Sequence, residues 1–140
     1  MEMKMKAKTT AKKRIQQIEV LLSNATVKAN MDSFLNKYVL CELACKLIIM
    51  EYKAAKKQSL PYNDIKMQTQ VIVAACHHVC LKVSDEVLRR LFSSADKRGS
   101  YSAKKLRDAI VHSMSINDIK EVNTRSIELH ADMDAFLNAL

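Results

Sequence analysis

Apolar side chains recur along most of this chain every three or four residues, the spacing of helices that bury one face. This pattern predicts helical segments over residues 14–23, 34–57, 62–83, 84–92, from 102 onward, and 118–140. The segment 34–57 is apolar almost all round, from Phe34 and Val39 through Leu43 and Leu47 to Tyr52. We therefore expect it to be central and buried on several sides.

Polar clusters divide these segments. Residues 24–30 are the expected break after the first helix, with Asp32 or Ser33 as the N-cap of the second. Residues 59–61 end that second helix, because they finish in a proline. Ser102 is the expected N-cap of the fifth helix, and residues 115–118 are expected to form a kink or a cap.

The chain has one glycine and one proline in 140 residues, which is too few turn residues for an all-β domain. The predicted fold is all-α, an antiparallel bundle of about five or six helices. We expect a single domain over residues 14–140. Residues 1–13 form a basic N-terminal arm, for which disorder is one alternative.

Charge is distributed unevenly. The formal net charge is +8, and residues 1–57 hold 12 Lys and Arg against 5 Asp and Glu, a local excess of +7. A basic half attracts RNA, DNA or an anionic membrane, although a solvated surface that keeps the protein in solution is the alternative. No apolar run reaches the roughly 18–20 residues of a membrane span, so we expect no membrane partner.

The four cysteines lie in apolar helical stretches, at positions 41, 45, 76 and 80. Two cysteine pairs with four-residue spacing could offer thiolates to a metal, but structural zinc sites use tighter turns. The basic start of the chain has no apolar segment of the secretory type. We therefore expect reduced, buried thiols in a cytoplasmic protein, with no metal and no cofactor.

One short segment carries candidate chemistry, Leu106 to Ser113. Within it, Arg107 can bind phosphate oxygens through its permanently charged fork, and His112 can move a proton near neutral pH. Asp108 lies one helical turn before His112 and could orient its ring. The spacing alone is common, and Arg125 and His130 repeat it further along the chain.

The segment resembles the motif of the HEPN superfamily, in which an Arg, four to six residues and a His lie near the start of a late helix. The polar Asp108 after the Arg, and the small apolar residues in the gap, match that pattern. The resemblance implies a HEPN-like bundle and a metal-independent endoribonuclease of toxin or phage-defence type. It assigns catalysis to Arg107 and His112, with Asp108 in support.

The resemblance also implies partners. RNA would be the substrate, cut by attack of its 2′-hydroxyl, and an antitoxin or other regulatory protein would be a further partner. The protein would be a homodimer paired through the face that bears Arg107 and His112, with two motifs in one cleft. We expect the neighbouring cations to contact RNA phosphates, or else to be ordinary solvated charges: Lys97, Arg98, Lys104 and Lys105.

Two positions bear on which branch of the superfamily this would be. One toxin branch has a Tyr two residues after the His, where this chain has Met114. Some members carry Glu-x3-Lys in an earlier helix, which Glu42 and Lys46 match, although a simple ion pair one turn apart is the more common reason for such spacing.

Two other functions remain open. The chain could be a non-catalytic HEPN-like adaptor that binds RNA or protein. It could also be a helical regulator that binds a partner through its Met-rich and Cys-rich helices, which would leave a large apolar patch exposed on the isolated chain.

Overall fold

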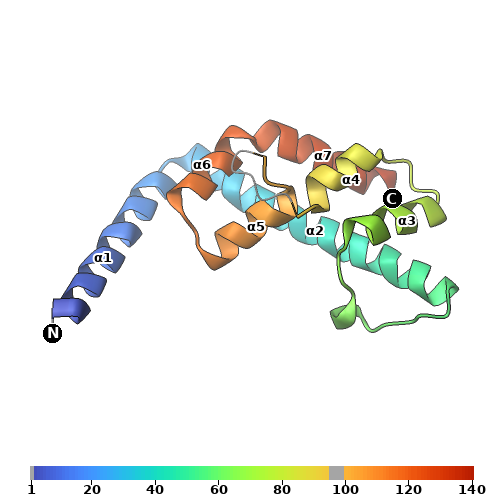
Figure 1. Ribbon diagram of the computed structural model, residues 1–140. Coiled ribbons are helices and arrows are strands. Elements are labelled where there is room, and N and C mark those ends of the chain that lie inside the picture. Colours follow the sequence, from blue (N-terminus) through green and yellow to red (C-terminus); the bar gives the residue numbers. More distant parts are fainter. Residues whose placement is uncertain (1, 95–99) are drawn as a thin grey trace.

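The computed structural model describes residues 2–94 and 100–140, with side chains from residue 7 onward. Over these ranges the chain is helical, without strands, and the expected all-α bundle is confirmed (Figure 1). The elements are α1 (Glu2–Leu22), α2 (Ala25–Ala55), the 3-10 turn η1 (Tyr62–Asp64), α3 (Thr69–His78), α4 (Asp85–Phe92), α5 (Ala103–His112), α6 (Ile116–Thr124) and α7 (Ser126–Ala139).

The long helix α2 is the centre of the bundle. It contacts α1, α3, α5, α6 and α7, while α1 projects away from the rest at one end (Figure 1). One cluster of buried side chains draws on every helix from α2 to α7. At its middle, Phe92 of α4 lies 6.3 Å from the Tyr38 ring of α2 and 5.4 Å from the Phe136 ring of α7. These rings join three helices that are far apart in sequence.

The structure corrects the expected start of α2. Asn24 caps the helix, because its side-chain oxygen accepts hydrogen bonds from the backbone nitrogens of Thr26 and Val27 at 3.0 and 3.2 Å. Residues 25–30 are therefore helical rather than a break, and Asp32 lies inside the helix, paired with Lys28. The helix extends this far because Val27 and Met31 are both buried.

The expected helix over 62–83 is also wrong. Pro61 begins a single 3-10 turn, and Ile65 then enters the core from extended backbone. The helix α3 occupies only Thr69–His78, and it ends where Cys80 adopts a left-handed φ of 58°. At that end the backbone nitrogen of Leu81 donates to the carbonyl oxygen of Cys76. Ile65 and Val83 share the apolar spacing of α3 without belonging to it.

Within the described residues there are seven α-helices rather than the expected five or six, because the closing stretch divides at Arg125 into α6 and α7. At the other end, α1 begins at Glu2 rather than at Arg14, so the basic residues 4–13 continue the first helix.

The outer face of α2 differs from the expectation too. Val39, Leu40, Leu43 and Leu47 are each between 44% and 57% exposed, although we expected this helix to be buried on several sides. All the covering helices use the opposite face, which carries Phe34, Tyr38, Cys41, Cys45 and Ile49. Across the described ranges, no helix combines the length and the apolar character needed to cross a membrane.

Candidate functional site

The helix α5 is fixed in place by its cap and by one buried face. The Ser102 hydroxyl accepts from the backbone nitrogen of Lys105 at 3.1 Å and donates to the carbonyl oxygen of Ser93. Ala103, Leu106 and Ile110 turn into the core. The remaining two sides of α5 therefore carry Arg107 on one side and His112 on the other.

Arg107 points toward α2 and is held there. Its Nη2 donates to Glu42 Oε2 at 2.7 Å, and its Nη1 lies 3.3 Å from Asp108 Oδ1. The guanidinium carbon is 5.2 Å from the centre of the Tyr38 ring, within the range of a cation–π contact. Glu42 also pairs with Lys46 at 3.7 Å. Glu42 therefore contacts two cations, Lys46 of its own helix and Arg107 of α5.

This contact is polar but poorly solvated. The Arg107 and Glu42 side chains are 23% and 21% exposed. The Arg107 Nε and the Tyr38 hydroxyl are both buried, and neither has a hydrogen-bond partner among the residues that the structure describes. Burial and the neighbouring Glu42 carboxylate raise the pKa of Tyr38 well above its usual value. Tyr38 therefore stays neutral and serves as a ring for Arg107 to lie against.

His112 is exposed at the end of α5 and opens onto a pocket. The cavity has a volume of about 480 Å³ and lies between α5 and the start of α6. Its lining residues are Tyr101, Lys105, Asp108, Ala109, His112, Ser113, Ser115 and Asp118. Lys105, Asp108 and His112 therefore share one open pocket. A site that transfers a proton next to a phosphate needs an acid/base group and a cation close together.

The structure brings some of the expected site residues together and separates others. Lys105, Asp108 and His112 line the same pocket, and Lys104 lines an adjoining one with Lys105 and Asp108. Arg107 is outside the His112 pocket, and Asp108 pairs with Arg107 rather than with His112. Asp108 is therefore the link between the two. Lys97 and Arg98 lie outside the described residues.

Two contacts at the site were not predicted from the sequence. Asp118 is 2% exposed and lines the His112 pocket, where its carboxylate accepts from the Ser115 hydroxyl at 2.6 Å. The Ser115 oxygen in turn accepts from the backbone nitrogen of Asp118, so the pair caps α6. Arg14 of α1 donates to the carbonyl oxygen of Ser113 at 3.0 Å. The Ser-x-x-Asp spacing signalled the first contact, whereas nothing local signalled the second.

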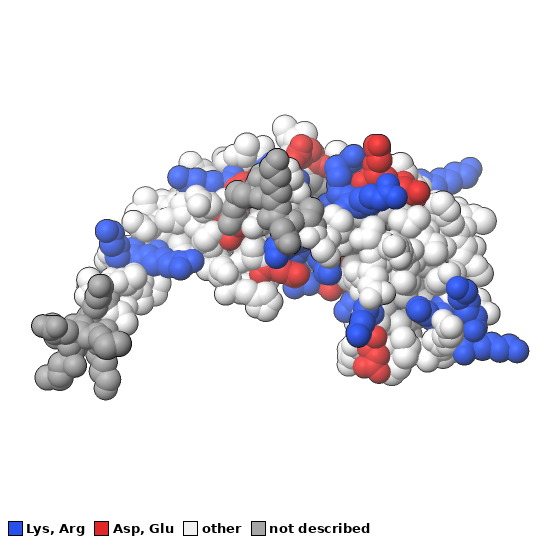
Figure 2. Space-filling view, viewed as in Figure 1, with Lys and Arg blue, Asp and Glu red and all other residues white. Residues whose placement is uncertain are grey.

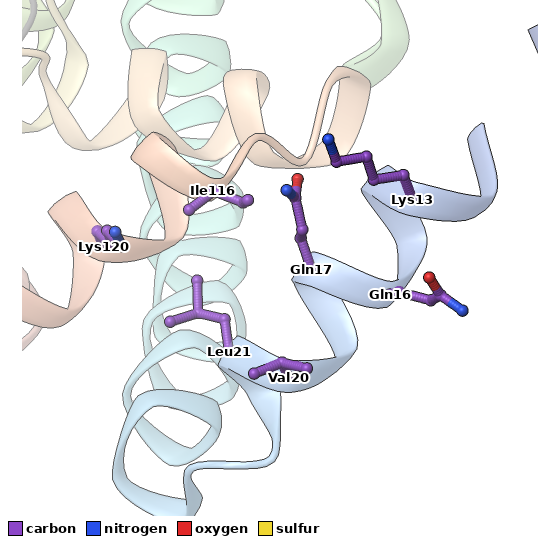
Figure 3. A pocket seen from close by; sticks show the side chains of 7 residues that line it. All are labelled: Lys13, Gln16, Gln17, Val20, Leu21, Ile116 and Lys120. Atoms are coloured by element: carbon purple, nitrogen blue, oxygen red, sulfur yellow. The ribbon is translucent and has the colours of Figure 1, made fainter. Parts of the chain in front are cut away.

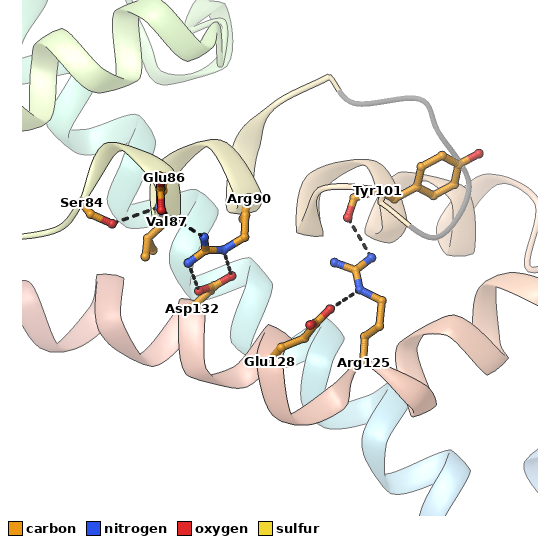
Figure 4. Close-up of polar contacts among 8 residues, drawn as sticks. All are labelled: Ser84, Glu86, Val87, Arg90, Tyr101, Arg125, Glu128 and Asp132. Carbon is orange, nitrogen blue, oxygen red and sulfur yellow. Dashed lines mark hydrogen bonds and ion pairs between the residues drawn. The ribbon is translucent and has the colours of Figure 1, made fainter.

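The second Arg-x4-His match has a structural role. Arg125 lies at the junction of α6 and α7, where it bonds Glu121. It also bonds Glu128 and the carbonyl oxygen of Tyr101 (Figure 4). His130 is partly buried, and burial, reinforced by the nearby Lys37, lowers its pKa. Arg125 thus holds the start of α5 against the α6–α7 corner.

The cysteines divide into buried and exposed thiols. Burial raises the pKa of Cys41 to about 12 and that of Cys76 to about 11, and it raises the pKa of Cys45 further. Cys80 is exposed, contrary to expectation, because it lies at the left-handed end of α3. Among the residues described, no three His, Cys, Asp or Glu side chains form a group that could hold a metal.

A second cavity of about 480 Å³ lies between α1 and α6 (Figure 3). Val20, Leu21 and Ile116 supply apolar surface there, and Lys13 and Lys120 supply charge. On the face shown in Figure 2, Lys and Arg are spread between both ends of the molecule, with acidic side chains interspersed, rather than gathered in one patch.

No family model, curated protein or solved structure matches the chain.

Proposed function

We propose that this protein is a metal-independent endoribonuclease of HEPN toxin or phage-defence type, with His112 as its general acid/base. The observation that supports this most is the position of His112, exposed at the mouth of a pocket that it shares with Asp108 and Lys105. RNA is then the substrate, and an antitoxin or other regulatory protein would hold the activity in check.

The reaction needs one proton removed and one delivered. The 2′-oxygen of a ribose attacks the adjacent phosphorus, and the bond from phosphorus to the leaving 5′-oxygen breaks. The products are a 2′,3′-cyclic phosphate and a 5′-hydroxyl. His112 can accept the proton of the attacking 2′-hydroxyl or deliver one to the 5′-oxygen, while Lys105 in the same pocket offsets the charge on the phosphate.

Arg107 contributes from the edge of the pocket. Its Nη1 faces Asp108, whereas Nη2 stays with Glu42. A phosphate entering the pocket would compete with Asp108 for Nη1, so Arg107 could stabilise the transition state without leaving Glu42. Asp108, displaced from Arg107, could then turn toward His112, one helical turn away on the same helix.

The test is cleavage of a mixed RNA pool in EDTA by the wild type and by His112→Ala and Arg107→Ala. We expect His112→Ala to lower the rate by about 100-fold or more, as loss of a general acid/base does. His78→Ala, which removes another exposed histidine, is the matched control and should cleave normally. Cleavage by His112→Ala at the wild-type rate would contradict the proposal.

A second candidate is a non-catalytic HEPN-like adaptor that binds RNA or protein. The 2.7 Å bond between Arg107 and Glu42 favours it, because an arginine engaged in this way can have a purely structural role. Binding and cutting separate the two candidates. An adaptor would retain labelled RNA or a partner protein equally well as wild type and as His112→Ala, and neither form would cut RNA.

A further inference from the structure

The outer face of α2 carries a regular row of side chains. Six residues lie along it in alternating steps of four and three: Asn36, Leu40, Leu43, Leu47, Met50 and Ala54. We call this row the α2 seam. Leu40, Leu43 and Leu47 are 55%, 44% and 50% exposed, and Val39 lies beside them at 57%. An apolar surface of this kind on a globular domain usually marks an interaction site.

The spacing identifies the kind of surface that would cover the seam. Alternating steps of four and three average about 3.5 residues, the repeat with which one helix packs its side chains into another in a coiled coil. The core-facing side of α2 follows a separate row of buried residues, so the seam is additional to the packing of the bundle. A second helix of similar length therefore fits it.

The charges beside the seam indicate which helix that is. Asp32 and Lys46 flank one side of the row, and Lys37 and Glu51 flank the other. In a parallel pair of helices, a residue on the first flank meets the residue five positions later on the second flank of its neighbour. Two copies of α2 would thus bring Asp32 to Lys37 and Lys46 to Glu51. Every such contact is between opposite charges.

An antiparallel pair would bring Lys37 to Glu51, but it would also bring Lys46 of both copies together at the centre. The parallel pair is more favourable because its flanking charges include no like-charged contact. Glu51 is exposed and makes no ion pair with any residue that the structure describes, so it is available. Lys46 is held by a long contact of 3.7 Å to Glu42 and lies 5.0 Å from the centre of the Tyr62 ring. Asp32 and Lys37 pair within the chain, with Lys28 at 3.1 Å and with Asp134 at 2.8 Å. Exchanging ion pairs at the surface for others with a partner costs little, because each is worth about 1 kcal/mol or less.

We propose that two copies of this protein pair in parallel through the α2 seam. This face differs from the one implied by the resemblance, which bears Arg107 and His112. Since Arg107 of α5 lies against Tyr38, on the buried face of α2, pairing through the seam leaves both His112 pockets open. The inference does not depend on the proposed ribonuclease function.

Sedimentation equilibrium over a range of protein concentrations tests the pairing. We expect the wild type to be a dimer, and Leu43→Glu to raise the dissociation constant by at least about 100-fold, because it places two carboxylates in the centre of the seam. Ile127→Glu is the matched control, since Ile127 is 89% exposed on α7, away from the seam. Far-ultraviolet circular dichroism and thermal melting of both variants will show that each is folded.

A wild type that is monomeric at every concentration would overturn the proposal, as would a dimer that persists unchanged in folded Leu43→Glu. The orientation has its own test in a Cys80→Ser background, which removes the exposed thiol. A parallel pair predicts that Leu43→Cys alone forms an intermolecular disulfide. A disulfide that forms only when Leu43→Cys is mixed with Leu47→Cys would show an antiparallel pair instead.

Discussion

Arg107 makes structural contacts and also has a role in the proposed reaction. It bonds Glu42 across two helices, lies against the Tyr38 ring, and touches the Asp108 carboxylate at the edge of the His112 pocket. A residue with these contacts contributes to stability whether or not it also acts on RNA. Denaturation of an Arg107 variant measures the contribution to stability, and its rate of RNA cleavage measures any contribution to catalysis.

Removing Arg107 should destabilise the fold. Arg107→Ala leaves the Glu42 carboxylate with only its long contact to Lys46, so we expect a loss of about 1–3 kcal/mol in the free energy of unfolding. Urea denaturation measures it. A double-mutant cycle with Glu42→Ala should show that the two changes are not additive.

The control for that cycle is Arg90→Ala. Arg90 makes two bonds to Asp132, at 2.9 and 3.0 Å, but its side chain is 53% exposed (Figure 4). Asp132 is 17% exposed, so the two pairs differ mainly in the exposure of the arginine. A pair whose arginine is open to solvent is worth about 1 kcal/mol or less. Equal losses of unfolding free energy for Arg90→Ala and Arg107→Ala would show that the partial burial of Arg107 does not strengthen its ion pair.

The cysteines allow a second prediction about individual side chains. In the native protein near pH 8, we expect one thiol to react quickly with a disulfide reagent such as DTNB, and we assign it to Cys80. The others react slowly because they are buried, and their raised pKa values leave little thiolate. Cys80→Ser should abolish the fast phase, and a remaining fast thiol would contradict the burial of the other three.

Residue spacing predicted part of the site. It placed Asp108 and His112 on one helix and Lys105 near them, because neighbours one turn apart follow from helix geometry. It could not predict that Glu42 would hold Arg107, since that contact depends on how α5 crosses α2. Exposure of Cys80 also followed from where α3 ends rather than from the apolar sequence around it.

The N-cap of α5 should contribute more to the free energy of unfolding than the N-cap of α4. Ser102→Ala removes a bond to the Lys105 nitrogen and leaves the Ser93 carbonyl without its donor, in a position that is 2% exposed. We expect it to cost about 1–2 kcal/mol by thermal or urea denaturation. Ser84→Ala removes only one bond at an exposed cap of α4, so it should cost less. A larger loss for Ser84→Ala would contradict this difference.

The end of α2 offers a stabilising change. Lys57 follows the helix with a φ of 58°, a conformation that is unfavourable for a residue with a Cβ and free for glycine. Lys57→Gly should raise the free energy of unfolding by about 0.5–1 kcal/mol. Lys56→Gly, at a φ of −91°, is the control and should lower it. Stabilisation by both would show that backbone conformation is not the cause.

Local signals predicted where several helices begin but not where others end. Ser102 was predicted as a cap and is confirmed, and the helical segment predicted to begin at residue 84 does begin there, with Ser84 as its cap. Asn24 is an equally good cap, but the apolar pattern before Phe34 is too sparse to show that Val27 and Met31 are buried. Because this chain has one glycine, α2 and α3 end in left-handed Lys57 and Cys80, which give no sequence signal.

At the scale of the whole protein, the His112 pocket and the α2 seam are both accessible to solvent, on different sides of the bundle. The first supports a chemical function, and the second supports association between copies. Because they lie on opposite sides of α2, we expect Leu43→Glu to change the oligomeric state without abolishing cleavage by His112.

The most direct measurement compares two substrates of the same sequence, ordinary RNA and fully 2′-O-methylated RNA, incubated with the wild-type protein in EDTA. We expect the protein to cut only the ordinary RNA and to leave 2′,3′-cyclic phosphate ends, because the attacking group is the 2′-hydroxyl. Equal cutting of both substrates would contradict 2′-hydroxyl attack. No cutting of either by folded protein would contradict the ribonuclease proposal and leave the adaptor as the better description.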